Sequence, residues 1–160
     1  MKNFKQEKLT LRNSYTKDAK LLFNWVNEKV VRKNSIKTDS IKWEEHIKWF
    51  ENTTKKSKVF IFIAEINNNP VGQIRFEKKN SKYLIDYSVD SGFRGKGIGE
   101  RILKKGMYLI ETTNNYPITF LAKVKCQNIP SKIIFEKLGF NKKLIMNSTI
   151  FFELKITKNE

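Results

Sequence analysis

Cysteine, histidine and long apolar runs are scarce in this chain, and each scarcity excludes a class of protein. A single cysteine, Cys126, leaves no partner for an internal disulfide, which excludes a disulfide-rich secreted fold. Because His46 is the only histidine, Cys126 is expected to be a packed residue, and no metal site is expected. The longest apolar run, residues 59–64, is too short to span a bilayer, and residues 1–8 lack the apolar segment of a signal peptide. These absences predict a cytoplasmic protein with no membrane partner.

Acidic residues are also few, with 16 Asp and Glu against 32 Lys and Arg, a formal charge of +16. The cations are spread along the chain, with 10, 8, 6 and 8 in successive blocks of forty residues. Nucleic-acid-binding domains gather their basic residues on one face or along one helix. We therefore expect no nucleic-acid partner. The positive field is expected to help recruit anionic small molecules.

The remaining composition is that of a globular domain, with 39% hydrophobic residues and neither a repeat nor a linker. Residues 1–160 are expected to form one domain. Alternating apolar residues predict strands, and apolar residues at helical spacing predict helices. The expected strands are residues 8–13, 58–65, 71–77, 82–89, 118–124, 140–146 and 149–156. The expected helices are residues 17–26, a segment that begins after Asp39 or Ser40 and reaches Phe50, 97–112 and 130–138. The order is β-α-α-β-β-β-α-β-α-β-β, which indicates an α/β fold.

The most informative segment is Arg94-Gly95-Lys96-Gly97-Ile98-Gly99, between an expected strand and an expected helix. Glycines let backbone N–H groups come close to phosphate oxygens, and a helix N-terminus adds partial positive charge. Arg94 and Lys96 are expected to supply counter-charge. A tight turn without a ligand explains the glycines alone, but not their place between a strand and a helix. The spacing matches neither the dinucleotide fingerprint nor the P-loop, so it predicts another kind of phosphate site.

A second motif consists of Asn128, Ser131 three residues later, Phe135 seven residues after the Asn, and then Gly139-Phe140. In this order and separation the two motifs resemble those of the GCN5-related N-acetyltransferases, the GNAT superfamily, and the resemblance covers residues 9–156. It implies a single mixed, twisted sheet of about seven strands flanked by about four helices, with strands four and five parallel and splayed. It also implies acetyl-CoA as co-substrate and no metal. The implied cofactor-binding residues are Val89, Arg94, Gly95, Lys96, Gly97, Ile98, Gly99, Asn128, Ser131 and Phe135.

The implied reaction is direct attack of a primary amine on the thioester. In this family the end of strand four, here Ser88 and Val89, gives a backbone N–H to the thioester carbonyl. Many members carry a Tyr as general acid where this chain has Phe135, so the proton donor to the thiolate is left open. Asp86, the only carboxylate inside the fourth expected strand, is the first candidate base, and Glu65 is a weaker one. Members that acetylate ribosomal-protein N-termini have a Glu at the place of Lys123.

The N-terminal third resembles the sugar-nucleotide branch of the superfamily, which acetylates the 4-amino group of UDP-linked 4-amino-4,6-dideoxy sugars. The expected partner is therefore a small-molecule amine, specifically a nucleotide sugar. The expected substrate-binding residues are Trp25, Asn27, Arg32, Trp43, His46 and Arg75, although His46 also fits a solvent-facing helical position and the tryptophans fit core packing. Three alternatives stay open. The acceptor is another small amine or amino acid, or it is a protein N-terminus, or the chain is a catalytically silent acyl-CoA-binding module. The oligomeric state is open too, a homodimer included.

Overall fold

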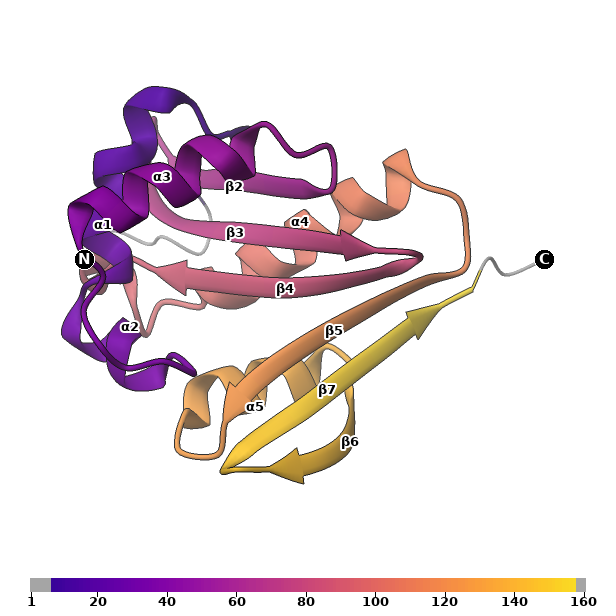
Figure 1. Ribbon diagram of the computed structural model, residues 1–160. Coiled ribbons are helices and arrows are strands. Elements are labelled where there is room, and N and C mark those ends of the chain that lie inside the picture. The colour runs from indigo at the N-terminus through magenta and orange to yellow at the C-terminus, as the bar shows by residue number, and fades with distance from the viewer. Residues whose placement is uncertain (1–6, 158–160) are drawn as a thin grey trace.

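Seven strands and five α-helices make up the computed structural model, which describes residues 7–157 (Figure 1). The strands are β1 (Leu9–Asn13), β2 (Val59–Ile66), β3 (Asn69–Lys79), β4 (Lys82–Val89), β5 (Ile118–Lys125), β6 (Asn141–Met146) and β7 (Thr149–Ile156). The helices are α1 (Ala19–Val26), α2 (Lys29–Asn34), α3 (Trp43–Thr54), α4 (Ile98–Thr113) and α5 (Ile129–Lys137). Two short 3-10 turns, Thr16–Asp18 and Ser91–Phe93, precede α1 and the glycine-rich loop.

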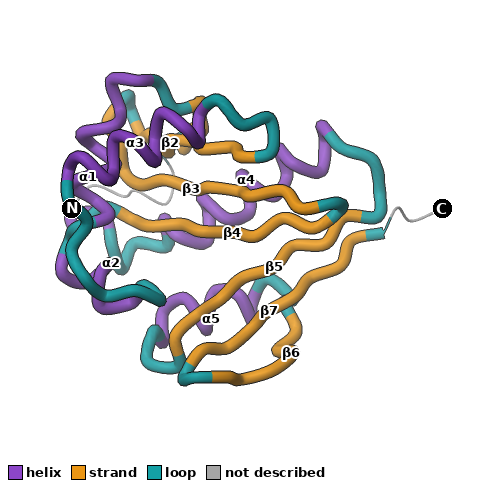
Figure 2. Tube along the Cα trace, in the orientation of Figure 1, coloured by secondary structure: helices purple, strands orange, loops and turns teal. Residues whose placement is uncertain are grey.

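The strands form one sheet in the order β1-β2-β3-β4-β5-β7-β6, and β4–β5 is its only parallel pair among the described residues. Parallel pairing runs from Lys82 opposite Thr119 to Ile85 opposite Ala122 and then ends. Beyond that point the two strands diverge, as the gap between β4 and β5 shows in Figures 1 and 2. Residues 86–89 of β4 therefore have no strand partner on the β5 side. The mixed sheet and the splayed pair confirm the expected fold class.

The two faces of the sheet carry separate hydrophobic cores. On one face α4 and α5 cover a large cluster that includes Ile74, Phe76 and Phe120. On the other face α1 and α3 cover a smaller cluster that includes Trp25, Phe50 and Ile63. The side chains of a strand point alternately to the two faces. Successive residues of β4 consequently face two different compartments.

Three chain reversals are built on asparagine in the left-handed backbone region. Asn67 and Asn68 have φ of 51° and 63° in the β2–β3 turn, Asn80 has 57° before β4, and Asn147 has 48° between β6 and β7. Asparagine tolerates this conformation better than most residues. These turns lie in the gaps between the expected strands 58–65, 71–77, 82–89, 140–146 and 149–156.

Two expectations about the N-terminal helices need correction. α2 was not expected, and it has no buried residue, so its apolar pattern carried no signal. α3 begins at Trp43 with Lys42 as its N-cap, a few residues after the expected start at Asp39 or Ser40. The segment between α2 and α3 is consequently irregular, and its course depends on side-chain contacts.

No helix in residues 7–157 has the length and apolar content needed to cross a bilayer. Within the same residues, no group of three or more His, Cys, Asp and Glu side chains gathers at one point.

Candidate functional site

A cavity of about 990 Å³ lies where β4 and β5 separate. This is the upper end of the volume range of small-molecule sites, about 300–1,000 Å³. Its walls come from the exposed half of β4, the end of β5, the loop before α4, the first turns of α5, and the α1–α3 region. Lys125 and Gln127, at the end of β5, donate hydrogen bonds to the Lys33 carbonyl of α2. The α2 segment is thereby fastened across the open end of the cleft.

The glycine-rich loop forms one wall of this cavity. Gly95 and Gly97 have φ of 72° and 75°, in the left-handed region that glycine adopts without strain. A Cβ built on either glycine would meet no atom within 4 Å, so the backbone is bare on this side. Gly97 is also the N-cap of α4. The first N–H groups of a helix have no intrahelical acceptor, and the helix dipole adds positive potential there. This loop can bind a phosphate group through its backbone.

The charged side chains of the loop, Arg94 and Lys96, form hydrogen bonds within the protein. Arg94 donates two hydrogen bonds to the Glu28 carboxylate, at 2.6 and 2.7 Å, and a third to the Val89 carbonyl at 3.0 Å. Lys96 donates to the Gly92 carbonyl at 2.6 Å. Arg94 was expected to supply counter-charge to a phosphate, but in the structure it is paired with a carboxylate of the protein. Its guanidinium is already neutralised by Glu28, and it ties the loop to the start of α2.

The second motif lies across the cavity, at the start of α5. The Asn128 side chain accepts a hydrogen bond from the Ser131 backbone N–H at 3.4 Å, and so caps the helix. Phe135 is 2% exposed, and its ring packs against Phe140 and Phe152 at centroid distances of 4.9 and 5.7 Å. Phe135 supports the wall of the cavity and presents no polar atom to it.

The register of β4 decides which backbone groups face the cleft. The Asp90 N–H donates to the Val71 carbonyl of β3, and the Ser81 carbonyl accepts from Thr119 of β5. In an antiparallel ladder the backbone groups of successive residues point to opposite sides. The N–H of Ser88 therefore points to β3, opposite Gln73, whereas those of Tyr87 and Val89 point to the cleft. Of the two expected N–H donors, Val89 faces the cleft and Ser88 does not, and Tyr87 takes the place of Ser88.

The other face of β4 carries a polar group of side chains. Asp86 is exposed and accepts a hydrogen bond from Gln73 Nε2 at 3.1 Å. Its cross-strand neighbour is Arg75, whose guanidinium carbon lies 5.3 Å from the centre of the Trp49 ring of α3. Trp49 is 37% exposed and lines the cavity together with Arg75 and Asp86. The Trp49 ring and the Arg75 guanidinium therefore form a flat, cationic surface, called the shelf below, beside the Asp86 carboxylate.

Three of the expected substrate-binding residues hold the N-terminal segment in place. Trp25 is 6% exposed, and its Nε1 donates to Asp90 Oδ2 at 2.8 Å. The amide of Asn27 pairs with both backbone groups of Ile41, at 2.7 and 3.0 Å. Arg32 makes four hydrogen bonds, to the carbonyls of residues 26, 37 and 39 and to the Ser35 hydroxyl. Burial lowers the Arg32 pKa from its ordinary value, and the nearby Asp86 carboxylate opposes this effect.

The remaining two lie on α3. His46 is 2% exposed, and its Nε2 donates to the Ala19 carbonyl at 2.8 Å, so the solvent-facing alternative is wrong. Burial lowers the pKa of His46, and the hydrogen bond to Ala19 only partly opposes this effect. Trp43 packs edge-on against Phe23 at 5.2 Å and does not belong to the cavity wall. The tryptophan that faces the cavity from this helix is Trp49.

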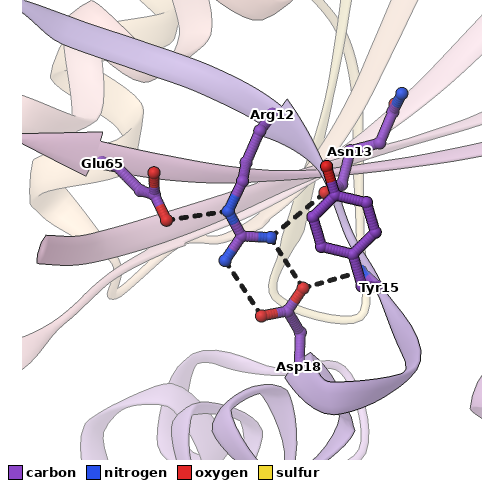
Figure 3. A network of polar contacts seen from close by, with 5 residues as sticks. All are labelled: Arg12, Asn13, Tyr15, Asp18 and Glu65. Carbon is purple, nitrogen blue, oxygen red and sulfur yellow. Dashed lines mark hydrogen bonds and ion pairs between the residues drawn. The ribbon is translucent and has the colours of Figure 1, made fainter. Parts of the chain in front are cut away.

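The weaker base candidate, Glu65, belongs to a separate polar network (Figure 3). It accepts a hydrogen bond from Arg12 Nε at 2.7 Å, and Arg12 also binds both oxygens of Asp18, at 2.7 and 3.0 Å. This network joins β1, β2 and the turn before α1, and Glu65 is not among the cavity-lining residues. Burial raises the pKa of Asp18. The hydrogen bonds from Arg12 and from the Tyr15 N–H lower this pKa by more than burial raises it, so the net shift is downward.

Cationic side chains outnumber carboxylates in the cavity wall. Its cations are Arg32, Lys37, Arg75, Arg94 and Lys123, and its carboxylates are Glu45 and Asp86. The sequence interpretation missed Glu28, which neutralises Arg94, and Tyr87, which lines the cavity. Strand alternation carried a signal for Tyr87, because it places that residue on the face of Val89, opposite Asp86. Nothing in the sequence pointed to Glu28, which lies 66 positions from its partner.

Several solved structures share this fold. A domain from Methanocaldococcus jannaschii DSM 2661 is 23% identical, with a TM-score of 0.83 over 94% of this chain and 100% of that one. Spermidine N-acetyltransferase from Vibrio cholerae, in complex with CoA and spermine, is 15% identical, with a TM-score of 0.82 over 93% and 95%. A ribosomal L7/L12 alpha-N-protein acetyltransferase in complex with CoA is 18% identical, with a TM-score of 0.79 over 92% and 94%. No curated protein sequence matches the chain.

The sequence itself matches the model of the Acetyltransferase (GNAT) family over residues 21–140, which is more than half of the chain. The matched region includes both motifs, the splayed strands and the cavity between them. The bare glycine loop at the start of α4 fits a pyrophosphate, and the unpaired half of β4 offers backbone groups to an extended pantetheine arm. The chain therefore belongs to the GNAT family and is an acetyl-CoA-dependent N-acetyltransferase.

Proposed function

We propose that the acceptor is the amine of an anionic amino sugar, specifically the 4-amino group of a UDP-linked 4-amino-4,6-dideoxy sugar. The observation that carries this proposal is the charge of the cavity wall: besides Arg94, which Glu28 neutralises, it has four cations against two carboxylates. A polycationic acceptor such as spermine or an aminoglycoside would be repelled by such a wall, whereas a diphosphate would be attracted. The net charge of +16 acts in the same direction.

The shelf formed by Trp49 and Arg75 suits a nucleotide sugar. The exposed indole offers a flat face on which a uracil or a sugar ring can stack. Arg75 makes no hydrogen bond or ion pair to the part of the chain that is described, so its guanidinium is available for a phosphate. Asp86 of β4 is the cross-strand partner of Arg75 of β3, which places a base beside the anion-binding group.

The donor half of the site has a distinct set of groups. The backbone around Gly95, Gly97 and the first turn of α4 would hold the pyrophosphate. The unpaired backbone of β4 would bind the pantetheine arm, with Asn128 on the opposite wall. The N–H of Val89 or Tyr87 would donate to the thioester carbonyl as its oxygen becomes negative. Much of the rate enhancement would then come from positioning the two substrates.

The amine must lose a proton in order to attack. An alkyl amine with a pKa of about 10.4 is only about one part in a thousand neutral near pH 7, so a base is useful. Asp86 would take this proton directly or through a water, while the new C–N bond forms and the C–S bond breaks. An amine on a sugar ring is less basic than that of lysine, so it needs less help from the base.

Release of free thiol from acetyl-CoA, measured with a panel of acceptors, tests the proposal. Turnover is expected with the UDP-4-amino sugar and not with spermine, an aminoglycoside or a ribosomal-protein N-terminal peptide. Preferred turnover of a polycation would contradict the charge argument. Tight acetyl-CoA binding with no turnover of any acceptor would indicate a catalytically silent module instead.

A matched pair of tryptophans tests the shelf. Trp49 and Trp43 lie on the same helix and are each 37% exposed, but only Trp49 lines the cavity. Trp49→Leu is expected to raise KM for the nucleotide sugar about tenfold or more, because a stacked base contributes about 1–3 kcal/mol. Trp43→Leu is expected to leave this KM unchanged. Equal effects of the two variants would refute the shelf.

A further inference from the structure

Tyr87 is a cavity-lining phenol on the donor side of the site. Of the five tyrosines in the chain, it is the one that lines this cavity. It stands on β4 two residues beyond Ile85, where pairing with β5 ends, so it lies where the cleft opens. Strand alternation places its side chain opposite to Asp86 and Ser88, on the face covered by α4 and α5. The phenol therefore belongs to the compartment of the cofactor, not that of the acceptor.

Contacts from two helices, α4 and α5, hold the tyrosine in one orientation. Its hydroxyl lies 3.0 Å from Ser131 Oγ in the first turn of α5. Its ring meets Phe135 edge-on at a centroid distance of 5.9 Å. A Cβ on Gly99 of α4 would lie only 3.2 Å from its Cε2, so the absence of a side chain at Gly99 makes room for the ring. The phenol thus spans the cleft from β4 to α5 between the glycine loop and Phe135.

The chemistry of thioester aminolysis gives such a hydroxyl a use. When the C–S bond breaks, its electron pair stays on sulfur and a thiolate leaves. A thiolate without a donor is a poorer leaving group in a site that excludes water. Phe135, at the centre of the α5 wall, has no hydroxyl and is 2% exposed. Lys123 and His46 also line the cavity, but Lys123 lies over the Phe151 ring and His46 is bonded to Ala19.

We propose that Tyr87 is a catalytic residue whose hydroxyl donates a hydrogen bond to the CoA sulfur as the thioester breaks. The assignment rests on the acetyl transfer of the proposed function, but not on which amine is the acceptor. Ser131 donates to the phenol oxygen while the phenol proton points to the sulfur. The amine proton passes to Asp86 and solvent, and solvent supplies the proton that converts the thiolate to free CoA.

The surroundings of the phenol suit a donor that keeps its proton. Burial raises the pKa of Tyr87, and the hydrogen bond with Ser131 offsets this only in part. The hydroxyl therefore stays protonated at neutral pH. The phenol therefore shares its proton with the sulfur through a hydrogen bond, and solvent completes the protonation of the thiolate.

A binding experiment that needs no acceptor tests the contact with sulfur. CoA, at a pH above the pKa of its thiol where the thiolate absorbance shows that it is ionised, is compared with desulfo-CoA by calorimetry. The preference for CoA over desulfo-CoA is expected to fall about tenfold in Tyr87→Phe, the usual effect of losing a hydrogen bond to a charged group. The matched control is Tyr83→Phe, on the same strand and face, whose hydroxyl binds Asn114 at 2.6 Å and lies outside this cavity. An unchanged preference in Tyr87→Phe overturns the proposal.

Turnover provides the second measurement. Tyr87→Phe is expected to lower kcat about 10- to 100-fold with little change in KM for acetyl-CoA, whereas Tyr83→Phe keeps the original kcat. In the double variant Tyr87→Phe/Phe135→Tyr, which returns a phenol to the same wall from α5, kcat is expected to recover. An unchanged kcat in Tyr87→Phe refutes the catalytic role. Because the calorimetric arm uses no amine, a wrong acceptor does not affect it.

Discussion

Replacing Gly97 with aspartate places a carboxylate at the proposed pyrophosphate site. Gly97 has φ of 75°, and a Cβ built on it meets no atom within 4 Å, so the new side chain has room. The backbone strain of a non-glycine residue here costs about 1–3 kcal/mol, and less for Asp or Asn. Asparagine at the same position has the same shape and no charge. The Asp–Asn pair therefore separates charge from strain.

The magnitude follows from Coulomb's law. A carboxylate about 6 Å from one phosphate charge, at an effective dielectric constant of about 20, is repelled by about 3 kcal/mol. This corresponds to roughly a hundredfold weaker binding. Gly97→Asp is therefore expected to raise the Kd of CoA at least a hundredfold, and Gly97→Asn less than tenfold. Added salt should reduce the difference, because the Debye length falls from about 8 Å at 0.15 M to 3 Å at 1 M.

Calorimetry with CoA and with acetyl-pantetheine, which lacks the pyrophosphate, completes the test. The difference between the Asp and Asn variants should vanish with acetyl-pantetheine, because no phosphate is present to be repelled. Thermal unfolding of both variants checks that they fold alike. Equal Kd values of the two variants for CoA would refute the phosphate site at Gly97.

Two further predictions concern carboxylates. Asp86→Asn is expected to lower kcat/KM about a hundredfold, because a general base contributes about 10²–10⁴-fold. The increase of kcat/KM with pH that comes from ionisation of the base is expected to disappear in this variant. An unchanged pH–rate profile would exclude Asp86 as the base. Asp18→Asn is expected to reduce the free energy of unfolding at pH 7 by about 1–3 kcal/mol, since Arg12 then loses a buried ionic partner. Because the folded pKa of Asp18 lies below its ordinary value of 3.8, the carboxylate stabilises the fold above that pH and the benefit is lost as acid protonates it. The gap between wild type and Asp18→Asn in urea unfolding should therefore narrow from pH 7 to pH 3, and a constant gap would contradict the linkage.

Local features of the sequence predicted where the strands end and the helices begin around the cleft. Glycine in the left-handed region, a helix start and a capping asparagine each depend on a few neighbouring residues. Gly97 and Asn128 are the N-caps of α4 and α5, close to the helix starts that the sequence placed at residues 97 and 130.

Contacts between distant segments could not be predicted in the same way. Arg94 meets Glu28 across 66 positions, and Trp25 meets Asp90 across 65, so no local pattern describes either pair. α2 was missed because none of its residues is buried and its six residues have no apolar stripe. His46 was given a solvent-facing alternative because helical periodicity does not show that Ala19 supplies a buried acceptor.

The sequence by itself determined the order of the elements other than α2, the two motifs and the family, because each follows from short-range spacing. The tertiary structure decided how the charged and polar groups are used. Strand register turned the N–H of Ser88 towards β3 and those of Tyr87 and Val89 towards the cleft. Packing of β4 against α4 and α5 placed the phenol of Tyr87 beside Phe135, which has no hydroxyl. Register and packing join residues far apart in the chain, and so their outcome is set only when the whole sheet has formed.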